Sequence, residues 1–283
     1  MPDPRFRRPR LLALDVDGTL LDGRGILRPR TVEAVARASR EGIRPVLCTG
    51  RRYRRALPIA RALGIDAPLV CNSGAIVKES VSHQTLWRAD FDAILLSEIF
   101  ALFQEHQHHV VAFTDRPPHE HDFVIGQIQS GRPLFDEYVN MNREHAHVDP
   151  DWARSGESHF HLCAIGDRPA MLALQRQMMD HFGDRVRTFV QKSLAYSGTM
   201  CEVLRHDASK WTAVLHLAEK WGVDPDEICA VGDDMNDLPM IAGAGFGVAM
   251  AHAPEAVKAA ANHVALGNDE DGVAVLIEEL LRV

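Results

Sequence analysis

Residues 11–20 read Leu11-Leu12-Ala13-Leu14-Asp15-Val16-Asp17-Gly18-Thr19-Leu20, an apolar run of strand length that leads straight into two carboxylates. If the apolar run is a buried strand, Asp15 and Asp17 point from the same side of its carboxyl end, because they stand at i and i+2. Two acids that share one small space cost free energy unless a cation neutralises them or one of them holds a proton. A surface turn of the D-x-D-G type would contain the same letters, but the apolar residues before it favour a strand that leaves a core. The stretch therefore predicts chemistry at the end of a buried strand.

The composition sets the class of protein. The chain has 283 residues, of which 46% are hydrophobic, enough for one large α/β domain or two smaller ones. A net charge of −8 argues against a general nucleic-acid binder or membrane-surface binder, because both partners would be repelled. No apolar stretch is long enough to span a bilayer, so we expect no transmembrane helix. The basic, proline-rich segment 1–10 lacks the apolar core of a signal peptide and is interpreted as a solvated tail.

The cysteines indicate the compartment. All five lie in or beside apolar runs, and none has C-x-x-C spacing: Cys48, Cys71, Cys163, Cys201 and Cys229. They are interpreted as small buried hydrophobic side chains in a reducing environment. We therefore expect a cytoplasmic protein.

Strands and helices alternate in the first part of the chain. Strands are expected over 11–14, 43–48 and 68–71, and helices over 31–40 and 52–63. This alternation is typical of a parallel sheet that is covered by helices on both faces. Ligands bind beyond the carboxyl ends of the strands in such sheets. Polar side chains stand at those ends in this sequence: Asp15, Asp17, Thr49 and Asn72.

The same rhythm returns near the C-terminus. Strands are expected over 200–204, 228–231, 246–249 and 263–265, and helices over 209–220, 254–261 and 270–282. The strand at 228–231 runs directly into Gly232-Asp233-Asp234-Met235-Asn236-Asp237. The two ends of the chain are therefore predicted to form the halves of one doubly wound, Rossmann-like parallel α/β core.

The middle of the chain mixes helices and alternating strand patterns. Helices are expected over 92–105 and 169–182, and strands over 110–113, 159–165 and 185–190. We predict a core domain of two segments, 1–83 and 193–283, with an α+β cap domain, 84–192, inserted between them. A domain inserted after a strand end is placed to act as a lid over the site.

Acids, a hydroxyl and a lysine are predicted to meet at one edge of the core sheet. They are Asp15 with Asp17, Thr49, Lys210, and Asp233 with Asn236 and Asp237. A cluster of hard oxygen ligands suits Mg²⁺, and a lysine and a threonine beside it suit a phosphoryl group. Each has an ordinary reading when taken alone, as a solvated lysine, a capping threonine, or acids at a helix N-terminus. Their order along the chain is what predicts a phosphate site.

That order carries a resemblance. D-x-D-G-T, then T-G-R, then a lysine, then G-D-D-x-N-D resembles the haloacid dehalogenase superfamily, and specifically its Cof-type branch with a large cap inserted between the second and third motifs. The segments Gly247-Val248-Ala249-Met250 and Glu270-Asp271-Gly272-Val273-Ala274, with Ala253 between them, are also similar to that branch. The cap matches in size and element order.

The resemblance implies a phosphatase that works through an aspartyl-phosphate. Asp15 would attack phosphorus and bind Mg²⁺, and Asp17 would act as general acid, then as general base, and give Mg²⁺ its backbone carbonyl. Asp233 would complete the metal site, and Asp237 would orient the metal shell and Lys210. The implied phosphate contacts are the backbone of Val16, the hydroxyl of Thr49, the amide of Gly50, Lys210 and Asn236.

Two positions depart from the pattern of that branch. It usually has Asn-Gly-Ala after the third strand, whereas this chain has Asn72-Ser73-Gly74-Ala75. A glycine commonly follows the motif lysine, and here the residue is Trp211. The second departure leaves the charge of the lysine unchanged.

The cap contains candidate specificity residues and many histidines. Four residues could meet an anionic or hydroxylated leaving group: Arg116, His121, Arg132 and Arg143. Three histidine pairs have i, i+2 spacing: His119 with His121, His145 with His147, and His159 with His161. Because no cysteine or H-E-x-x-H helix accompanies them, we interpret them as surface or core histidines rather than as a second metal site.

The sequence thus predicts Mg²⁺-dependent hydrolysis of a small phosphomonoester, with sugar phosphates as the leading class by resemblance. The expected partner is a small phosphorylated metabolite, with no nucleic acid and no membrane. A sugar phosphomutase is one alternative, and a non-catalytic phospho-acceptor or binding module, which also uses an Asp, a Thr and a Lys at a sheet edge, is another. Asp17 counts against the acceptor, because a pure acceptor does not need an acid two residues on.

Overall fold

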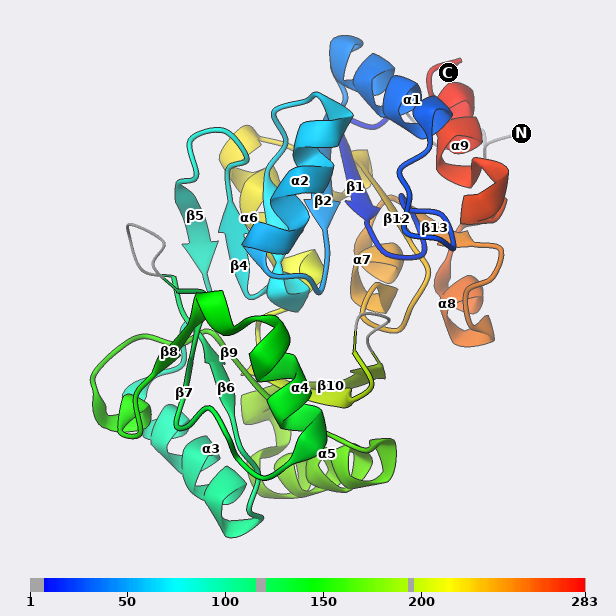
Figure 1. Cartoon of the computed structure of the whole chain (residues 1–283). Coiled ribbons are helices and arrows are strands. Elements are labelled where there is room, and N and C mark those ends of the chain that lie inside the picture. Colours follow the sequence, from blue (N-terminus) through cyan, green and yellow to red (C-terminus); the bar gives the residue numbers. More distant parts are fainter. Residues whose placement is uncertain (1–7, 116–120, 193–195, 283) are drawn as a thin grey trace. The chain divides into compact units, whose positions relative to one another are not determined.

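The computed structural model describes residues 8–115, 121–192 and 196–282 (Figure 1). The chain divides into two compact units. We call them the core unit, Met1–Arg88 with Ser209–Val283, and the inserted unit, Ala89–Ala208. Residues 1–7 of the basic N-terminal segment, and the candidates Arg116 and His119, lie outside the described residues.

The core unit is built on an eight-stranded sheet. Its strands are β1 (Leu11–Asp15), β2 (Arg44–Cys48), β3 (Leu69–Cys71), β4 (Ile76–Lys78), β5 (Thr85–Arg88), β12 (Ile228–Gly232), β13 (Phe246–Met250) and β14 (His263–Ala265). The strand order is β14-β13-β12-β1-β2-β3-β4-β5, parallel from β14 to β3 and antiparallel for β4 and β5. The predicted parallel α/β core is confirmed, and it is extended at one edge by a hairpin that the sequence pattern did not predict.

Strand β1 lies inside this sheet, and all five of its residues are buried. An apolar strand without alternation is what a parallel sheet covered on both faces requires. From β1 the chain runs outward through β2 and β3, and its second segment runs outward on the other side from β12 through β13 and β14. The strand order therefore reverses between β1 and β12. In open α/β sheets, ligands bind at the carboxyl ends of the strands at such a reversal.

Helices cover both faces of the core sheet. They are α1 (Pro29–Arg40), α2 (Tyr53–Leu63), α6 (Lys210–Trp221), α7 (Leu238–Gly243), α8 (Glu255–Ala260) and α9 (Gly272–Leu280). Leu11 and Ala13 of β1 pack in one cluster with residues of α6, α7 and α8. The alternation of a strand turns Leu12 and Leu14 to the opposite face, where α1 packs against α2 and α9 (Figure 1).

The inserted unit has its own sheet and core. Its elements are α3 (Ala93–Glu105), β6 (Val111–Phe113), β7 (Phe123–Ile125), α4 (Pro133–Met141), β8 (Ala146–Val148), β9 (His161–Gly166), α5 (Arg168–Phe182), β10 (Val186–Lys192) and β11 (Thr199–Arg205). The strand order is β10-β11-β9-β6-β7-β8, and buried residues of α3 and α5 pack in one apolar cluster with residues of the sheet. The assignment of 200–204 to the core sheet is wrong, because β11 pairs with β9 and β10 here. A buried strand has the same apolar pattern in either sheet.

Two simpler expectations can be compared with the structure. All five cysteines are buried free thiols, as predicted. Among the described residues, none of the helices combines the length and the apolar character that crossing a membrane demands.

Candidate active site

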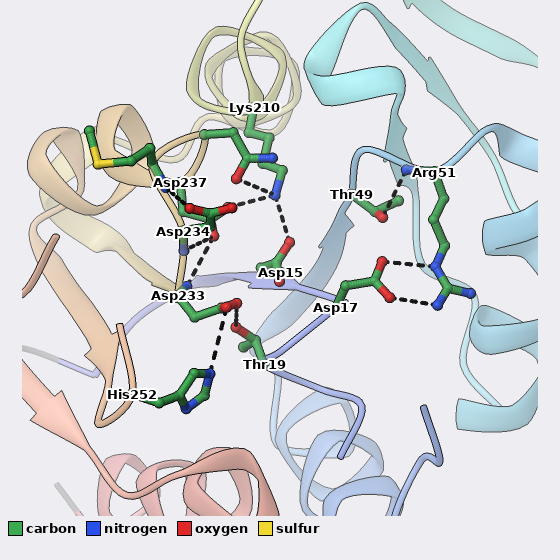
Figure 2. A network of polar contacts seen from close by, with 12 residues as sticks. Asp15, Asp17, Thr19, Thr49, Arg51, Lys210, Asp233, Asp234, Asp237 and His252 are labelled. Carbon is green, nitrogen blue, oxygen red and sulfur yellow. Dashed lines mark hydrogen bonds and ion pairs between the residues drawn. The ribbon is translucent and has the colours of Figure 1, made fainter. Parts of the chain in front are cut away.

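Three segments that are distant in sequence meet where β1 and β12 end. The two strands pair in parallel with Leu14 opposite Val231, so Asp15 and the loop that begins at Asp233 leave the sheet side by side. The first residue of α6, Lys210, places its Nζ 2.6 Å from Oδ1 of Asp15. The same Nζ lies 2.6 Å from Oδ1 of Asp237. Figure 2 shows Lys210 between the two carboxylates.

The position of Lys210 is fixed by its neighbours on α6 and by an adjoining turn. Ser209 caps the helix by accepting a hydrogen bond from the Thr212 amide at 3.0 Å. A Cβ on Gly74 would lie 2.1 Å from the carbonyl carbon of Ser209, so only glycine allows the turn after β3 to approach this closely. Asn72 and Ser73 have φ values of 50° and 56°, and the extra residue of Asn72-Ser73-Gly74 is therefore accommodated in left-handed backbone.

The other departure from the family pattern is a packing residue. Trp211 faces α7, where a Cβ on Gly243 would lie 2.5 Å from the indole ring. The tryptophan thus fills space between α6 and α7 and leaves Lys210 directed at the carboxylates.

Burial controls the charges at this centre. The Asp15 and Lys210 side chains are 5% and 1% exposed. Burial raises the pKa of Asp15 well above its ordinary value, and Asp237 adds to the effect while Lys210 opposes it. Burial also disfavours the charge on Lys210, but Asp15 and Asp237 outweigh it and raise the lysine's pKa. Lys210 is therefore a permanently charged ammonium held between two acids.

The acids outnumber this lysine and can hold a metal ion. Asp15, Asp233 and Asp237 each offer a carboxylate oxygen, and these oxygens all lie within 4.8 Å of one another. The Oδ2 atom of Asp15 is buried without a hydrogen-bond donor. Three carboxylates beside one ammonium leave an excess of negative charge, and burial followed by repulsion from Asp237 raises the pKa of Asp233. A hard divalent cation such as Mg²⁺ fits this donor set.

Asp237 uses both of its carboxylate oxygens for hydrogen bonds within the loop and with Lys210, rather than for binding a metal ion. Its Oδ2 accepts hydrogen bonds from the amides of Asp233 and Asp234 at 3.0 and 3.1 Å, and its Oδ1 accepts one from Lys210. The Asn236 Oδ1 atom lies 3.5 Å from the Lys210 Nζ. These hydrogen bonds fix the loop around Lys210. Asp15 and Asp233 are then the acids whose oxygens can bind a metal ion.

Asp233 is held from two sides. Its Oδ1 accepts a hydrogen bond from the Thr19 hydroxyl at 2.9 Å, and the imidazole Nε2 of His252 lies 3.6 Å from its Oδ2. Gly18 has a φ of +83°, and a Cβ there would lie 2.3 Å from the Asp233 Oδ2 atom. The glycine of D-x-D-G is therefore required both by the turn and by the carboxylate behind it.

Asp17 is paired with a different side chain from Asp15. Its two oxygens accept hydrogen bonds from Nε and Nη2 of Arg51 at 2.8 and 2.5 Å. Figure 2 shows Asp17 turned toward Arg51 and Asp15 turned toward Lys210. The two acids therefore have different partners: β1 ends at Asp15, and the turn beyond it brings Asp17 to Arg51.

The turn after β2 supplies hydrogen-bond donors. The Thr49 hydroxyl, which is fully buried, accepts a hydrogen bond from the Arg51 amide at 3.1 Å, so its proton is free to be donated. The amide of Gly50 has no acceptor among the residues that the structure describes. Val16 is buried between Asp15 and Asp17, and its carbonyl accepts a hydrogen bond from the Leu21 amide at 2.9 Å.

His121, His161 and Arg132 of the inserted unit make packing or local contacts. His121 stacks on His147 with ring centroids 4.8 Å apart, and His161 stacks on Phe113 at 4.6 Å. The guanidinium of Arg132 donates a hydrogen bond to the Gln107 carbonyl at 2.9 Å. Arg143 is exposed.

Sequence reasoning missed three side chains at this site. Arg51 and Thr19 belong to the motifs T-G-R and D-x-D-G-T. The sequence therefore locates both residues, but it does not indicate which side chains they contact. His252 reaches Asp233 from the turn after β13, and no spacing in the sequence indicates that contact.

The chain is similar to known proteins along nearly its whole length. A family model of haloacid dehalogenase-like hydrolases matches residues 12–277. A pyridoxal phosphate phosphatase of Escherichia coli is 28% identical over an alignment of 285 positions, which covers 95% of this chain and 97% of that protein. A 5-amino-6-(5-phospho-D-ribitylamino)uracil phosphatase of Bacillus subtilis is 27% identical over 96% of this chain and 97% of its own length. The crystal structure of a haloacid dehalogenase-like hydrolase from Bacteroides thetaiotaomicron superimposes with a TM-score of 0.77 at 25% identity, covering 98% of this chain and 100% of that one.

Proposed function

Because the chain belongs to the haloacid dehalogenase-like hydrolases and is a phosphatase of that superfamily, we propose that it hydrolyses small phosphomonoesters with Mg²⁺ through an aspartyl-phosphate on Asp15. The observation that carries the proposal is the buried pair of Asp15 and Lys210, with Asp233 beside it, where the strand order reverses. A phosphoryl group needs a nucleophile and a cation at one place. This site offers both.

Asp15 is the proposed nucleophile. One of its carboxylate oxygens attacks phosphorus. The bond from phosphorus to the ester oxygen breaks, and Asp17 gives its proton to the departing alcohol. In the second half-reaction Asp17 takes a proton from the water that attacks the aspartyl-phosphate, which releases phosphate and restores Asp15. The exposure of Asp17, 49% for its side chain, leaves it open to both the alcohol and water.

The phosphoryl oxygens are held by groups from several elements. Lys210 balances their charge, and Thr49 donates the hydroxyl proton that its bond with the Arg51 amide leaves free. The other proposed contacts are the backbone of Val16, the amide of Gly50 and the side chain of Asn236.

The proposed metal ligands are Asp15, the backbone carbonyl of Asp17 and Asp233. Asp237 orients the loop and Lys210 without binding the ion, since both of its oxygens already accept hydrogen bonds. When bound, Mg²⁺ neutralises charge between the nucleophile and the phosphoryl group. The unpartnered Oδ2 atom of Asp15 supports this assignment.

Sugar phosphates and similar phosphorylated metabolites are the proposed substrate class. Two relatives are phosphatases of pyridoxal phosphate and of 5-amino-6-(5-phospho-D-ribitylamino)uracil, and both of these compounds are small phosphomonoesters. We place this reaction in the cytoplasm, since the five buried free thiols suit a reducing compartment.

A panel of phosphomonoesters, assayed for phosphate release with and without Mg²⁺, tests the proposal. Asp15→Asn should abolish turnover and the acid-stable, hydroxylamine-sensitive phosphoryl label. Asp234→Asn, which changes an exposed acid of the loop that contains Asp233, serves as control. Persistent turnover in Asp15→Asn would refute the nucleophile. Transfer of phosphate back to the sugar, without free phosphate, would indicate a phosphomutase instead.

A further inference from the structure

The Arg51 side chain has hydrogen-bonding capacity that the chemistry above does not use. A guanidinium carries five N–H donors in a fixed plane. In Arg51, Nε and one N–H of Nη2 are bound to Asp17. Nη1, with two donors, has no acceptor within the part of the chain that the structure describes. Arg51 can therefore hold Asp17 and bind a further group through its outer edge.

This edge lies on the open side of the site. The side chains of Asp15, Lys210 and Asp237 are at most 5% exposed, whereas those of Arg51 and Asp17 are 35% and 49% exposed. A phosphoryl group bound at Asp15 must direct its ester oxygen toward the proton donor Asp17. The alcohol that leaves is therefore on the same side as the guanidinium, one residue beyond the phosphate-binding turn of Thr49 and Gly50.

The surroundings of Arg51 are basic. Arg51-Arg52-Tyr53-Arg54-Arg55 contains four arginines in five residues, although the whole chain has a net charge of −8. Helix α2, which begins there, has no acidic residue in its first turn. The positive end of the helix dipole adds to the potential of the arginines. Because Arg52 is buried and both Arg52 and Arg54 have partners of their own, the Nη1 group of Arg51 is the donor that can meet an anion.

Building on the proposed phosphatase function, we propose that Arg51 is a specificity residue that binds an anionic group, a carboxylate or second phosphate, on the alcohol part of the substrate. The planar edge of a guanidinium matches the oxygens of both groups. The preferred substrates are then phosphomonoesters of acidic alcohols, such as phosphorylated hydroxy acids and sugar bisphosphates, rather than neutral sugar phosphates.

Matched substrate pairs test this inference. Glycerol 3-phosphate and 3-phosphoglycerate differ in the carboxylate, and fructose 6-phosphate and fructose 1,6-bisphosphate differ in the second phosphate. We expect kcat/KM to be about tenfold to a hundredfold higher for the anionic member of each pair, the range for a hydrogen-bonded charged contact. Arg51→Gln should erase this preference through a higher KM for the anionic member, and Arg51→Lys should keep part of it.

The matched control is Arg61→Gln, which removes the same charge from the exposed far end of α2. It should leave the preference unchanged. Equal losses on both members of a pair in Arg51→Gln would reduce Arg51 to a positioning residue for Asp17 and overturn the inference.

A binding measurement separates this inference from the proposed function. In the Asp15→Asn background, calorimetry gives dissociation constants for both members of a pair without turnover. A preference for 3-phosphoglycerate that depends on Arg51 supports the anion site even if no phosphatase activity is found. Equal affinities overturn it even if p-nitrophenyl phosphate is hydrolysed well and the phosphatase assignment stands.

Discussion

Lys210 Nζ lies 2.6 Å from Asp15 Oδ1, although 195 positions separate the two residues in the sequence. Both side chains are buried, so each depends on the other for its charge. The contact joins the first strand of the chain to a helix of its second segment, and it links stability of the core unit to the chemistry of the site.

Lys210→Met should reduce both the stability of the core unit and the activity of the site. The change leaves Asp15 and Asp237 buried without a counter-charge, and we expect a loss of about 3–5 kcal/mol in unfolding free energy together with loss of phosphate release. Arg37→Gln breaks an exposed ion pair with Glu41 and should leave the free energy of unfolding nearly unchanged. Urea unfolding of the two variants measures the difference. Equal costs would mean that the buried pair contributes no more than a surface one.

Gly18→Ala should disturb the metal site as well as the backbone. Alanine is strained at a φ of +83°, and its Cβ would lie 2.3 Å from the Asp233 Oδ2 atom. Gly25 has a φ of +75° and no atom within 4 Å of the place that a Cβ would occupy, so Gly25→Ala adds strain alone and is the matched control. We expect each to cost about 1–3 kcal/mol of stability, and only Gly18→Ala to weaken Mg²⁺ binding, by at least about tenfold (roughly 1.4 kcal/mol). Calorimetric titration with Mg²⁺ checks this, and unchanged affinity in Gly18→Ala would contradict it.

The meeting of Asp15 and Asp233 could be predicted from sequence, because both acids follow apolar strands and parallel strands end at one edge of a sheet. The pairing of Asp17 with Arg51 could not, since Asp17 lies beyond the last residue of β1, where the two-residue period no longer applies. The contact of His252 with Asp233 depends on the path of the turn after β13, which periodicity does not describe.

Periodicity also has limits in the prediction of strands and of their places in a sheet. Strand β4 has three residues, too few to show a period, and so the hairpin of β4 and β5 was not predicted. Strand β11 was recognised as a strand but assigned to the wrong sheet, because burial on both faces gives the same apolar pattern in both.

Thr49→Val should show what the hydroxyl of Thr49 contributes to activity, because the volume of the side chain is kept. Valine keeps the buried volume but loses the acceptor of the Arg51 amide and the proposed donor to phosphate. We expect kcat/KM to fall about tenfold to a hundredfold, the effect of losing a hydrogen bond to a charged group. Thr49→Ser keeps the hydroxyl and should remain within a few-fold of the original enzyme. If both variants behave alike, the hydroxyl makes no contact with the phosphoryl group.

The inserted unit should lose stability in acid because of His161. Burial lowers the pKa of His161 from 6.5 to about 3, so the folded protein keeps this imidazole neutral where the unfolded chain protonates it. The unfolded state then binds more protons between these two values, and stability falls as pH decreases through that window, by up to about 1.4 kcal/mol per pH unit. His161→Phe keeps a ring to stack on Phe113 and removes the titration. Its stability should therefore decline less steeply than that of the original chain between about pH 6 and about pH 4, which lie inside the window.

Hydrogen exchange of the β9 amides reports on the inserted unit alone and is the appropriate measurement. His206→Gln, at an exposed position of the same unit, is the control and should leave the pH dependence unchanged. If His161→Phe and the original chain show parallel exchange profiles across the acid range, the buried imidazole is not the group that the unfolded state protonates.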